Sequence, residues 1–168
     1  MTRFTQIDRI QELVPGRRLV AVKNLTLAES YLHDHFPRFP VMPGVMMLES
    51  MYQAAAWLVR ISEQFAHSMV VLQEAKNVKF ADFVQPGDQL VVTCEWVSET
   101  PQTVVMKCEG TVGSRAAVKA RLTLERYNLV DRDPAEAPVD RHMILEFQRQ
   151  FALLYPQGAA ADHAAGPV

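Results

Sequence analysis

Apolar and polar residues alternate most clearly between residues 115 and 125. The even-numbered positions from 116 to 124 are all Ala, Val or Leu, and the odd-numbered positions are mostly charged or polar. Successive side chains of a β-strand point to opposite faces of its sheet, so a period of two indicates a strand with one buried face. We therefore predict a strand over these residues.

Three further segments have the composition of strands. Residues 91–97 and 103–111 alternate apolar with mixed residues and flank the turn sequence SETPQ, which predicts a β-hairpin. Residues 17–27, RRLVAVKNLTL, follow a Pro-Gly turn and predict the first strand of the chain. Strand-like runs separated by turn signals extend over residues 69–125 as a whole.

One long helix is expected over residues 45–64, which contain neither Gly nor Pro. At a rise of about 1.5 Å per residue, it would be roughly 30 Å long. Its first fifteen residues are apolar on nearly every face, and such a helix is buried all round. A curved antiparallel sheet wrapped around this helix, an α+β fold, is the architecture that the pattern predicts.

Residues 35–44, HFPRFPVMPG, lead into this helix. Prolines at positions 37, 40 and 43 exclude a helix here and favour an extended path. After Tyr127 the composition changes to a charged, Pro-containing linker, and residues 144–154 carry apolar side chains at helical spacing. We expect one domain over residues 1–127, and over 128–168 a linker, a short helix and a disordered tail.

Composition narrows the functional classes. The chain of 168 residues is 49% hydrophobic and has a formal net charge of -2, without a basic cluster that would indicate nucleic-acid binding. The N-terminal residues contain no apolar run typical of a signal peptide or a membrane anchor, so we expect a cytoplasmic protein without membrane contact. Cys94 and Cys108 are too few for a disulfide framework and are expected to be reduced core residues.

Glu49 is the single charged residue between positions 45 and 59. In a water-poor environment its carboxyl group would serve as a proton donor. A solvated position near the helix N-terminus, where a carboxylate interacts favourably with the helix dipole, is an equal alternative. The sequence leaves both open.

Two other groups complete the candidate chemistry. His35 lies fourteen positions before Glu49 and has the side chain best suited to act as a base near neutral pH. His33 could join it in binding a metal, but no third ligand is placed nearby, so no metal is expected. The Gly44 amide stands at the predicted helix N-terminus, where it could polarise a thioester carbonyl.

Residues 35–56, HFPRFPVMPGVMMLESMYQAAA, resemble the signature of the 3-hydroxyacyl-[acyl-carrier-protein] dehydratases of the FabZ type, roughly HFPxxPxMPGVxxxEAxxQ. Flanking segments are similar as well, including Asp8-Arg9-Ile10, Val78-Lys79-Phe80 and Pro86-Gly87-Asp88. The resemblance extends over about residues 6–125. It implies the hot-dog fold, in which a sheet wraps a central helix and two subunits join their sheets edge to edge.

The resemblance also implies the roles of the site residues. His35 of one chain would face Glu49 of the other in a homodimer or a larger assembly of dimers. His35 would remove the C2 proton of a (3R)-3-hydroxyacyl thioester, the Gly44 amide would stabilise the carbonyl oxygen, and Glu49 would assist loss of the 3-hydroxyl as water. No cofactor is implied. The acyl group is expected to contact these further residues: Phe36, Phe39, Met42, Val45 and Gln53.

The sequence departs from this pattern in three places. The family commonly has an N-terminal helix before the Asp-Arg segment and a glycine at the position of Asp34. It often has a basic run where this chain reads Ala81-Asp82-Phe83. Docking of an acidic carrier protein normally uses positive charge, so either acyl-carrier-protein or coenzyme A thioesters are expected as substrates. A hot-dog thioesterase and a non-catalytic acyl-thioester binder are the alternative functions.

Overall fold

The computed structural model describes residues 5–33, 35 and 38–156. Within these residues, six strands form one antiparallel sheet in the order β1-β2-β4-β5-β6-β3. The strands are β1 Arg9–Val14, β2 Arg18–Asn24, β3 Met69–Phe80, β4 Gln89–Glu99, β5 Thr103–Val112 and β6 Arg115–Tyr127. β1 and β3 therefore form the two edges of the sheet.

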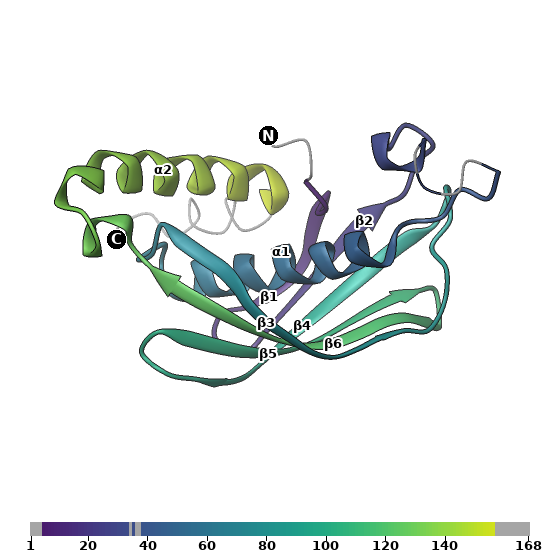
Figure 1. Ribbon diagram of the computed structural model, residues 1–168, viewed down its shortest axis with the longest axis horizontal. Coiled ribbons are helices and arrows are strands. Elements are labelled where there is room, and N and C mark those ends of the chain that lie inside the picture. The colour runs from purple at the N-terminus through teal and green to yellow at the C-terminus, as the bar shows by residue number, and fades with distance from the viewer. Residues whose placement is uncertain (1–4, 34, 36–37, 157–168) are drawn as a thin grey trace, which may run out of the picture.

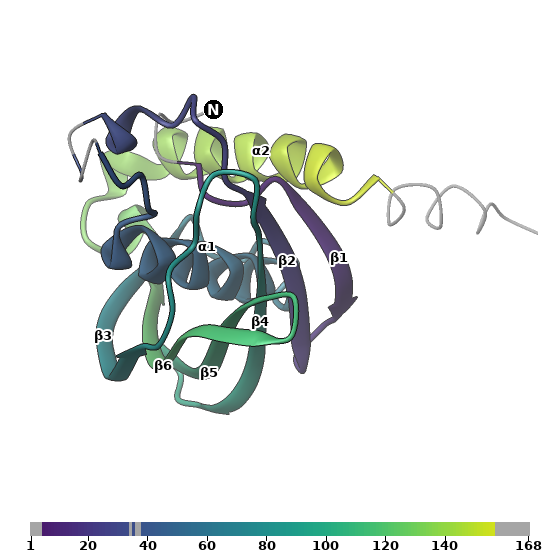
Figure 2. The same ribbon diagram turned by 90° about the vertical axis from the view of Figure 1, so that its right-hand side faces the viewer.

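The sheet curls around α1, which spans Gly44–Ser62 (Figures 1 and 2). A second helix, α2, spans Ala137–Leu154 and lies on the side of α1 away from the sheet (Figure 1). The molecule thus has three layers, with α1 in the middle. Nearly every residue from Met51 to Val59 is buried, as expected for a helix that is apolar on all sides. The predicted α+β hot-dog architecture is confirmed.

The strand faces follow the sequence pattern. In β6, Val118, Ala120, Leu122 and Leu124 are buried against α1, which confirms the predicted alternation. The alternation breaks at the start of the strand, where the β5–β6 register shifts between Gly110 and Thr111. The hairpin of β4 and β5 is also confirmed. Its two cysteines, at positions 94 and 108, are buried, free and directly opposite each other.

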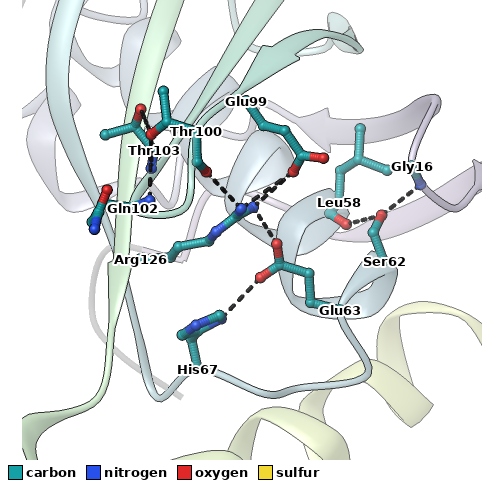
Figure 3. A network of polar contacts seen from close by, with 10 residues as sticks. All are labelled: Gly16, Leu58, Ser62, Glu63, His67, Glu99, Thr100, Gln102, Thr103 and Arg126. Carbon is teal, nitrogen blue, oxygen red and sulfur yellow. Dashed lines mark hydrogen bonds and ion pairs between the residues drawn. The ribbon is translucent and has the colours of Figure 1, made fainter. Parts of the chain in front are cut away.

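Arg126 continues the inward-facing positions of β6 and is only 9% exposed. Its guanidinium forms ion pairs with Glu63, at the C-terminal end of α1, and with Glu99 of β4 (Figure 3). It also donates a hydrogen bond of 2.9 Å to the Thr100 carbonyl. A buried charge needs such compensation. This network fixes the end of α1 to the β4–β5 hairpin.

The strand at the N-terminal edge was not predicted. The first strand was expected over residues 17–27, whereas β1 already begins at Arg9 and pairs with β2 across a turn in which Gly16 has a φ of 68°. Only Ile10 of β1 is buried, because β1 is an edge strand with little contact to the core. An edge strand of this kind has too few apolar residues to show a clear period of two.

The segment after β6 is more ordered than a linker. It contains the short 3-10 helices η2 Leu129–Asp131 and η3 Pro134–Glu136, and α2 begins seven residues before the expected position 144. The two prolines that suggested a linker, Pro134 and Pro138, lie in the first turns of η3 and α2, where their missing N–H groups are not needed. The tail expected to be disordered, residues 157–168, lies outside the described residues, and the domain division at residue 127 stays a prediction.

Asp140 attaches α2 to the rest of the molecule. Its carboxylate accepts a hydrogen bond from the Ser68 hydroxyl, just before β3, and from the backbone amides of Leu129 and Val130 at 3.0 and 2.9 Å. Burial alone would raise the pKa of Asp140, but the three hydrogen bonds outweigh it and lower the pKa below its ordinary value of 3.8. Asp140 is therefore held as a carboxylate.

In the parts of the chain that the structure covers, neither helix is both long and apolar enough to span a membrane.

Replacing Asp140 by Asn is expected to lower the free energy of unfolding at neutral pH, because the charged acceptor of three donors is lost. A group whose pKa is lowered by folding stabilises the protein above its unfolded pKa, and this contribution disappears as the pH falls through the folded pKa. The gap between wild type and Asp140→Asn should therefore narrow below about pH 4. Denaturant unfolding followed by circular dichroism over a pH series measures it.

Asp133→Asn is the matched control. Asp133 is exposed and caps a single amide, that of Ala135, at 2.9 Å. It should cost less stability than Asp140→Asn. A gap for Asp140→Asn that stays constant into acid would contradict the role assigned to this carboxylate.

Candidate active site

His35 and Gly44 line one cavity, of about 360 Å³, at the N-terminal end of α1. His35 is half-buried, and its backbone amide donates a hydrogen bond of 3.2 Å to the Tyr31 carbonyl. The remaining wall is mostly apolar and consists of Val41, Met42, Met47, Phe80, Ala81, Asp82 and Phe83. An imidazole and a helix N-terminus thus open into the same hollow.

The lead-in to α1 is held in place by backbone contacts. The Met42 amide donates a hydrogen bond of 2.8 Å to the Val84 carbonyl, and the Met42 side chain is buried. Pro43 is the N-cap of α1 with extended dihedral angles, so the helix begins at Gly44, one residue before the expected start at position 45. The described part of this segment, residue 35 and residues 38–43, contains no helix, which agrees with its prolines.

A side chain at position 44 would collide with an aromatic ring. An added Cβ would lie 3.0–3.2 Å from three ring atoms of Phe80. Glycine therefore lets the ring of Phe80, at the end of β3, pack directly against the first turn of α1. This contact closes one side of the His35 cavity.

Glu49 lies in a different hollow. It is half-buried, so neither of the two environments left open by the sequence applies in its extreme form. The Gln53 side-chain amide donates a hydrogen bond of 2.7 Å to Glu49 Oε1, and Gln53 Oε1 accepts one of 2.8 Å from the Gln6 backbone amide. This chain of hydrogen bonds fixes the orientation of the Glu49 carboxyl group.

The Glu49 hollow lies between α1 and α2 and has a volume of about 250 Å³. From α1 it is lined by Glu49, Tyr52, Gln53, Ala56, Trp57 and Arg60, and its other lining residues are Thr5, Phe147, Gln150 and Leu154. The α2 residues close it on the side away from the sheet. The sequence predicted Glu49 and Gln53 but missed the rest of this cavity.

Arg60 and aromatic rings form the far end of this hollow. The guanidinium carbon lies 3.9 Å from the centroid of the Phe147 ring and 5.7 Å from that of Trp57, and the Trp57 and Phe147 rings meet edge to face. Burial lowers the pKa of Arg60 to about 10, against the opposing effect of the Tyr52 hydroxyl. Burial likewise raises the pKa of Tyr52.

The helix itself explains why His35 and Glu49 line different cavities within one chain. Each residue of an α-helix turns by about 100°, so Glu49 lies roughly 140° around α1 from Gly44. The cavity at Gly44 and the cavity at Glu49 therefore open on different sides of α1. Within a single chain, the structure does not bring the predicted catalytic pair into one pocket.

Two of the expected substrate contacts that the structure describes are not assembled in either cavity. Val45 is 66% exposed and Phe39 is 48% exposed, with the Phe39 ring edge-on to Phe83 at a centroid distance of 5.6 Å. Neither lines a cavity of this chain. Phe36 and Asp34 lie outside the described residues. The assignment of these residues to substrate binding stays a prediction.

No metal-binding cluster is evident in the described residues: none of their His, Cys, Asp and Glu side chains gather in groups of three or more. His33, the second histidine of the lead-in, is exposed and does not line the His35 cavity.

The sequence contained a signal for the α1 residues of this cavity that were not predicted, but none for those of α2. Four residues of α1 have the spacing of one helical face, at positions 49, 53, 56 and 60. Three of them, Glu49, Gln53 and Arg60, are polar residues in a mostly apolar helix. No sequence signal pointed to the contributions of α2, because an apolar stripe on a helix does not reveal which surface it covers.

A curved antiparallel sheet around a central helix, with candidate catalytic groups at and near the start of that helix, defines a hot-dog protein of the acyl-thioester type. More specifically, the chain belongs to the FabA-like domain family, whose model matches residues 1–121. This match includes both His35 and Glu49.

Curated relatives show which members of this family the chain is similar to. The 3-hydroxyacyl-[acyl-carrier-protein] dehydratase FabZ of Lactiplantibacillus plantarum is 40% identical over 117 residues, which cover 70% of this chain and 80% of that protein. The protein of the same name from Levilactobacillus brevis is 41% identical over 117 residues, with 70% and 79% covered. The predicted resemblance to FabZ-type proteins is confirmed.

Solved structures share the fold at low sequence identity. The dehydratase heterocomplex ApeI:P from Xenorhabdus doucetiae matches with a TM-score of 0.66 at 13% identity, over 82% of this chain and 92% of that one. A Streptococcus mutans protein bound to acetyl CoA matches with a TM-score of 0.56 at 16% identity, over 70% and 86%. At these identities, the likeness shows the hot-dog fold alone.

Proposed function

We propose that the protein dehydrates (3R)-3-hydroxyacyl thioesters to trans-2-enoyl thioesters in fatty-acid or related acyl-chain biosynthesis. The observation that carries this proposal is the match to FabZ dehydratases at about 40% identity, together with His35, Gly44 and Glu49 at the matching motif positions. The names of these relatives specify acyl-carrier-protein substrates. For this protein, the proposed substrates are acyl-carrier-protein thioesters, and the corresponding coenzyme A thioesters are the simpler substrates of the same chemistry.

The reaction needs one proton removed and one delivered. His35 accepts the proton from C2 while the Gly44 amide donates a hydrogen bond to the thioester oxygen, on which negative charge grows. The C3–O bond then breaks, Glu49 protonates the leaving hydroxyl, and water departs as the C2–C3 double bond forms. The half-buried Glu49, oriented by Gln53, suits this role. The chemistry requires no cofactor.

The separation of the two cavities supports a shared site in a homodimer. The His35 cavity holds the base but no acid from α1, and the Glu49 cavity holds the acid but no base. A second copy that placed its Glu49 cavity against the His35 cavity would complete both sites at once, as isologous twofold contacts do.

Two surface features support such a dimer. β3 is a twelve-residue edge strand, whose outer backbone groups are available for pairing with a second sheet. Exposed apolar side chains gather near its end and near the lead-in, namely Phe39, Val45, Phe80 and Phe83. Burial of such side chains is the usual driving force for subunit association.

Replacing His35 by Ala or Glu49 by Gln is expected to abolish enoyl formation, with a loss of at least about a hundredfold, because each removes one of the two proton-transfer groups. The measurement is enoyl product and free thiol from a purified 3-hydroxyacyl thioester. Free thiol without enoyl product would instead indicate a thioesterase. Binding without turnover would indicate a non-catalytic protein.

Mixed dimers test the shared site. A dimer of one His35→Ala chain and one Glu49→Gln chain has one complete site if the pair forms across chains, so about half of the wild-type activity should return. The control is a dimer of one wild-type chain and one chain carrying both substitutions, which should then be inactive. The opposite result, an inactive first dimer and an active second one, would place the site within one chain. Two affinity tags verify the composition.

Gln53→Leu is expected to lower kcat about tenfold with little change in KM, because Glu49 loses the hydrogen bond that positions it. The loss should be smaller than that of Glu49→Gln. Steady-state kinetics measures this split, and the thermal unfolding midpoint reports whether the fold is intact. A change confined to KM would assign Gln53 to substrate binding alone.

A further inference from the structure

The cavity between α1 and α2 has a defined direction. Glu49, Gln53, Ala56 and Arg60 follow one face of α1 and all line it. Glu49 and Arg60 are eleven residues apart, which corresponds to about 16 Å along the helix axis. If the thioester reacts at Glu49, as proposed above, the acyl group runs along this face and its distal end lies at Arg60.

The far end of the cavity differs from a simple apolar tunnel. Ala56, Trp57, Phe147 and Leu154 line it with carbon, but the guanidinium of Arg60 is placed among them. Gln150 of α2 adds a second polar group to this wall. A cavity built for the methyl end of an ordinary acyl chain has no need of a cation, because burying a charge is costly.

Arg60 has incomplete compensation for its charge. The ion pairs found among the described residues involve other side chains, and none includes Arg60. Its Nε is buried, and no hydrogen-bond partner is found for it in the described part of the chain. By contrast Arg126, which is more deeply buried than Arg60, has two carboxylates (Figure 3).

The contacts that Arg60 does make are weak substitutes for an anion. The faces of Phe147 and Trp57 attract a cation through their ring quadrupoles, and the Tyr52 hydroxyl has a favourable electrostatic effect on the guanidinium. That hydroxyl in turn donates to the Val70 carbonyl at 2.9 Å, so its own orientation is fixed. Arg60 is thus held in one position with donor capacity left over.

We propose that Arg60 is a specificity-determining residue that selects acyl groups whose distal end carries an oxygen acceptor, above all a carboxylate, in place of a methyl group. The acceptor would occupy the end of the cavity, accept hydrogen bonds from the guanidinium and supply the missing counter-charge. This inference rests on the proposed dehydratase function and deepens it by naming the substrate class.

The test compares 3-hydroxyacyl thioesters that differ only at the distal end. For a series of chain lengths, kcat/KM for enoyl formation is measured with a methyl, a hydroxyl and a carboxylate end. The wild-type protein should favour the carboxylate over the methyl end by about tenfold or more at the length that reaches Arg60, and the hydroxyl end should lie between them. The preference should vanish for shorter chains.

Arg60→Met keeps the length of the side chain and removes its charge. The carboxylate-to-methyl ratio should fall by about tenfold or more, and Arg60→Lys should retain part of it. Arg132→Met is the control, because Arg132 also stacks on an aromatic ring, that of Tyr127 at 4.3 Å, but does not line the cavity. Its ratio should equal that of the wild type.

Two outcomes would overturn the inference. The first is a wild-type protein that prefers the methyl end at every length, a result that needs no variant to fold. The second is a carboxylate-to-methyl ratio of kcat/KM that stays unchanged in Arg60→Met while the thermal unfolding midpoint falls. In that case Arg60 would only stabilise the packing of α2 and would not select substrates.

A binding measurement separates this inference from the proposed function. Calorimetry with the Glu49→Gln protein gives the affinity ratio of the carboxylate and methyl substrates without turnover. If no substrate yields enoyl product while the ratio still favours the carboxylate, the dehydratase proposal fails and the role of Arg60 stands. Equal affinities at every length would defeat the role of Arg60 whatever the enzyme does.

Discussion

The structure depends on the burial of α1 between two layers. The helix is apolar on nearly all sides, so the sheet that covers one side leaves a second hydrophobic face exposed to water unless something covers it. In this protein α2 covers it, with Phe147 and Phe151 against Trp57 and the Asp140 hydrogen bonds anchoring the start of α2. The hydrophobic effect sets the three-layer order, and the polar contacts fix where the layers attach.

Both cavities follow from this arrangement. The N-terminal end of α1 projects past the packed core, where the extended lead-in and the end of β3 surround the His35 cavity. Further along, the polar face of α1 passes under α2 and encloses the Glu49 cavity. The same helix therefore supplies an N-terminus to one cavity and a row of side chains to the other. The proposed second copy would bring the two cavities together.

The buried Arg126 and the half-buried Arg60 show how position decides the use of a charge. Arg126 is neutralised by Glu63 and Glu99 and serves the fold (Figure 3). Arg60 lies against aromatic rings in a cavity, and it forms no ion pair with a carboxylate of the described residues. A compensated charge is a structural link, whereas an uncompensated one in a cavity can recognise a ligand.

The sequence by itself determined the elements whose patterns are strong. These are the buried helix from its unbroken apolar run, β6 from its period of two, the hairpin from its flanking turn residues, and His35, Gly44 and Glu49 from a motif. It could not reveal β1, because an edge strand buries only Ile10 and so shows little periodicity. It also misjudged the start of α2, since Pro138 suggests a linker unless its place in the first helical turn is known.

Only the tertiary structure decided which surfaces meet. The apolar stripe of α2 could have covered any face, and its position over Trp57 and Arg60 is what makes a cavity there. Likewise, the sequence placed His35 and Glu49 fourteen residues apart, but their separation into two cavities arises from the rotation of α1 and the path of its lead-in. Local patterns report the burial of a residue, whereas a site is defined by contacts between segments distant in sequence, which no local pattern encodes.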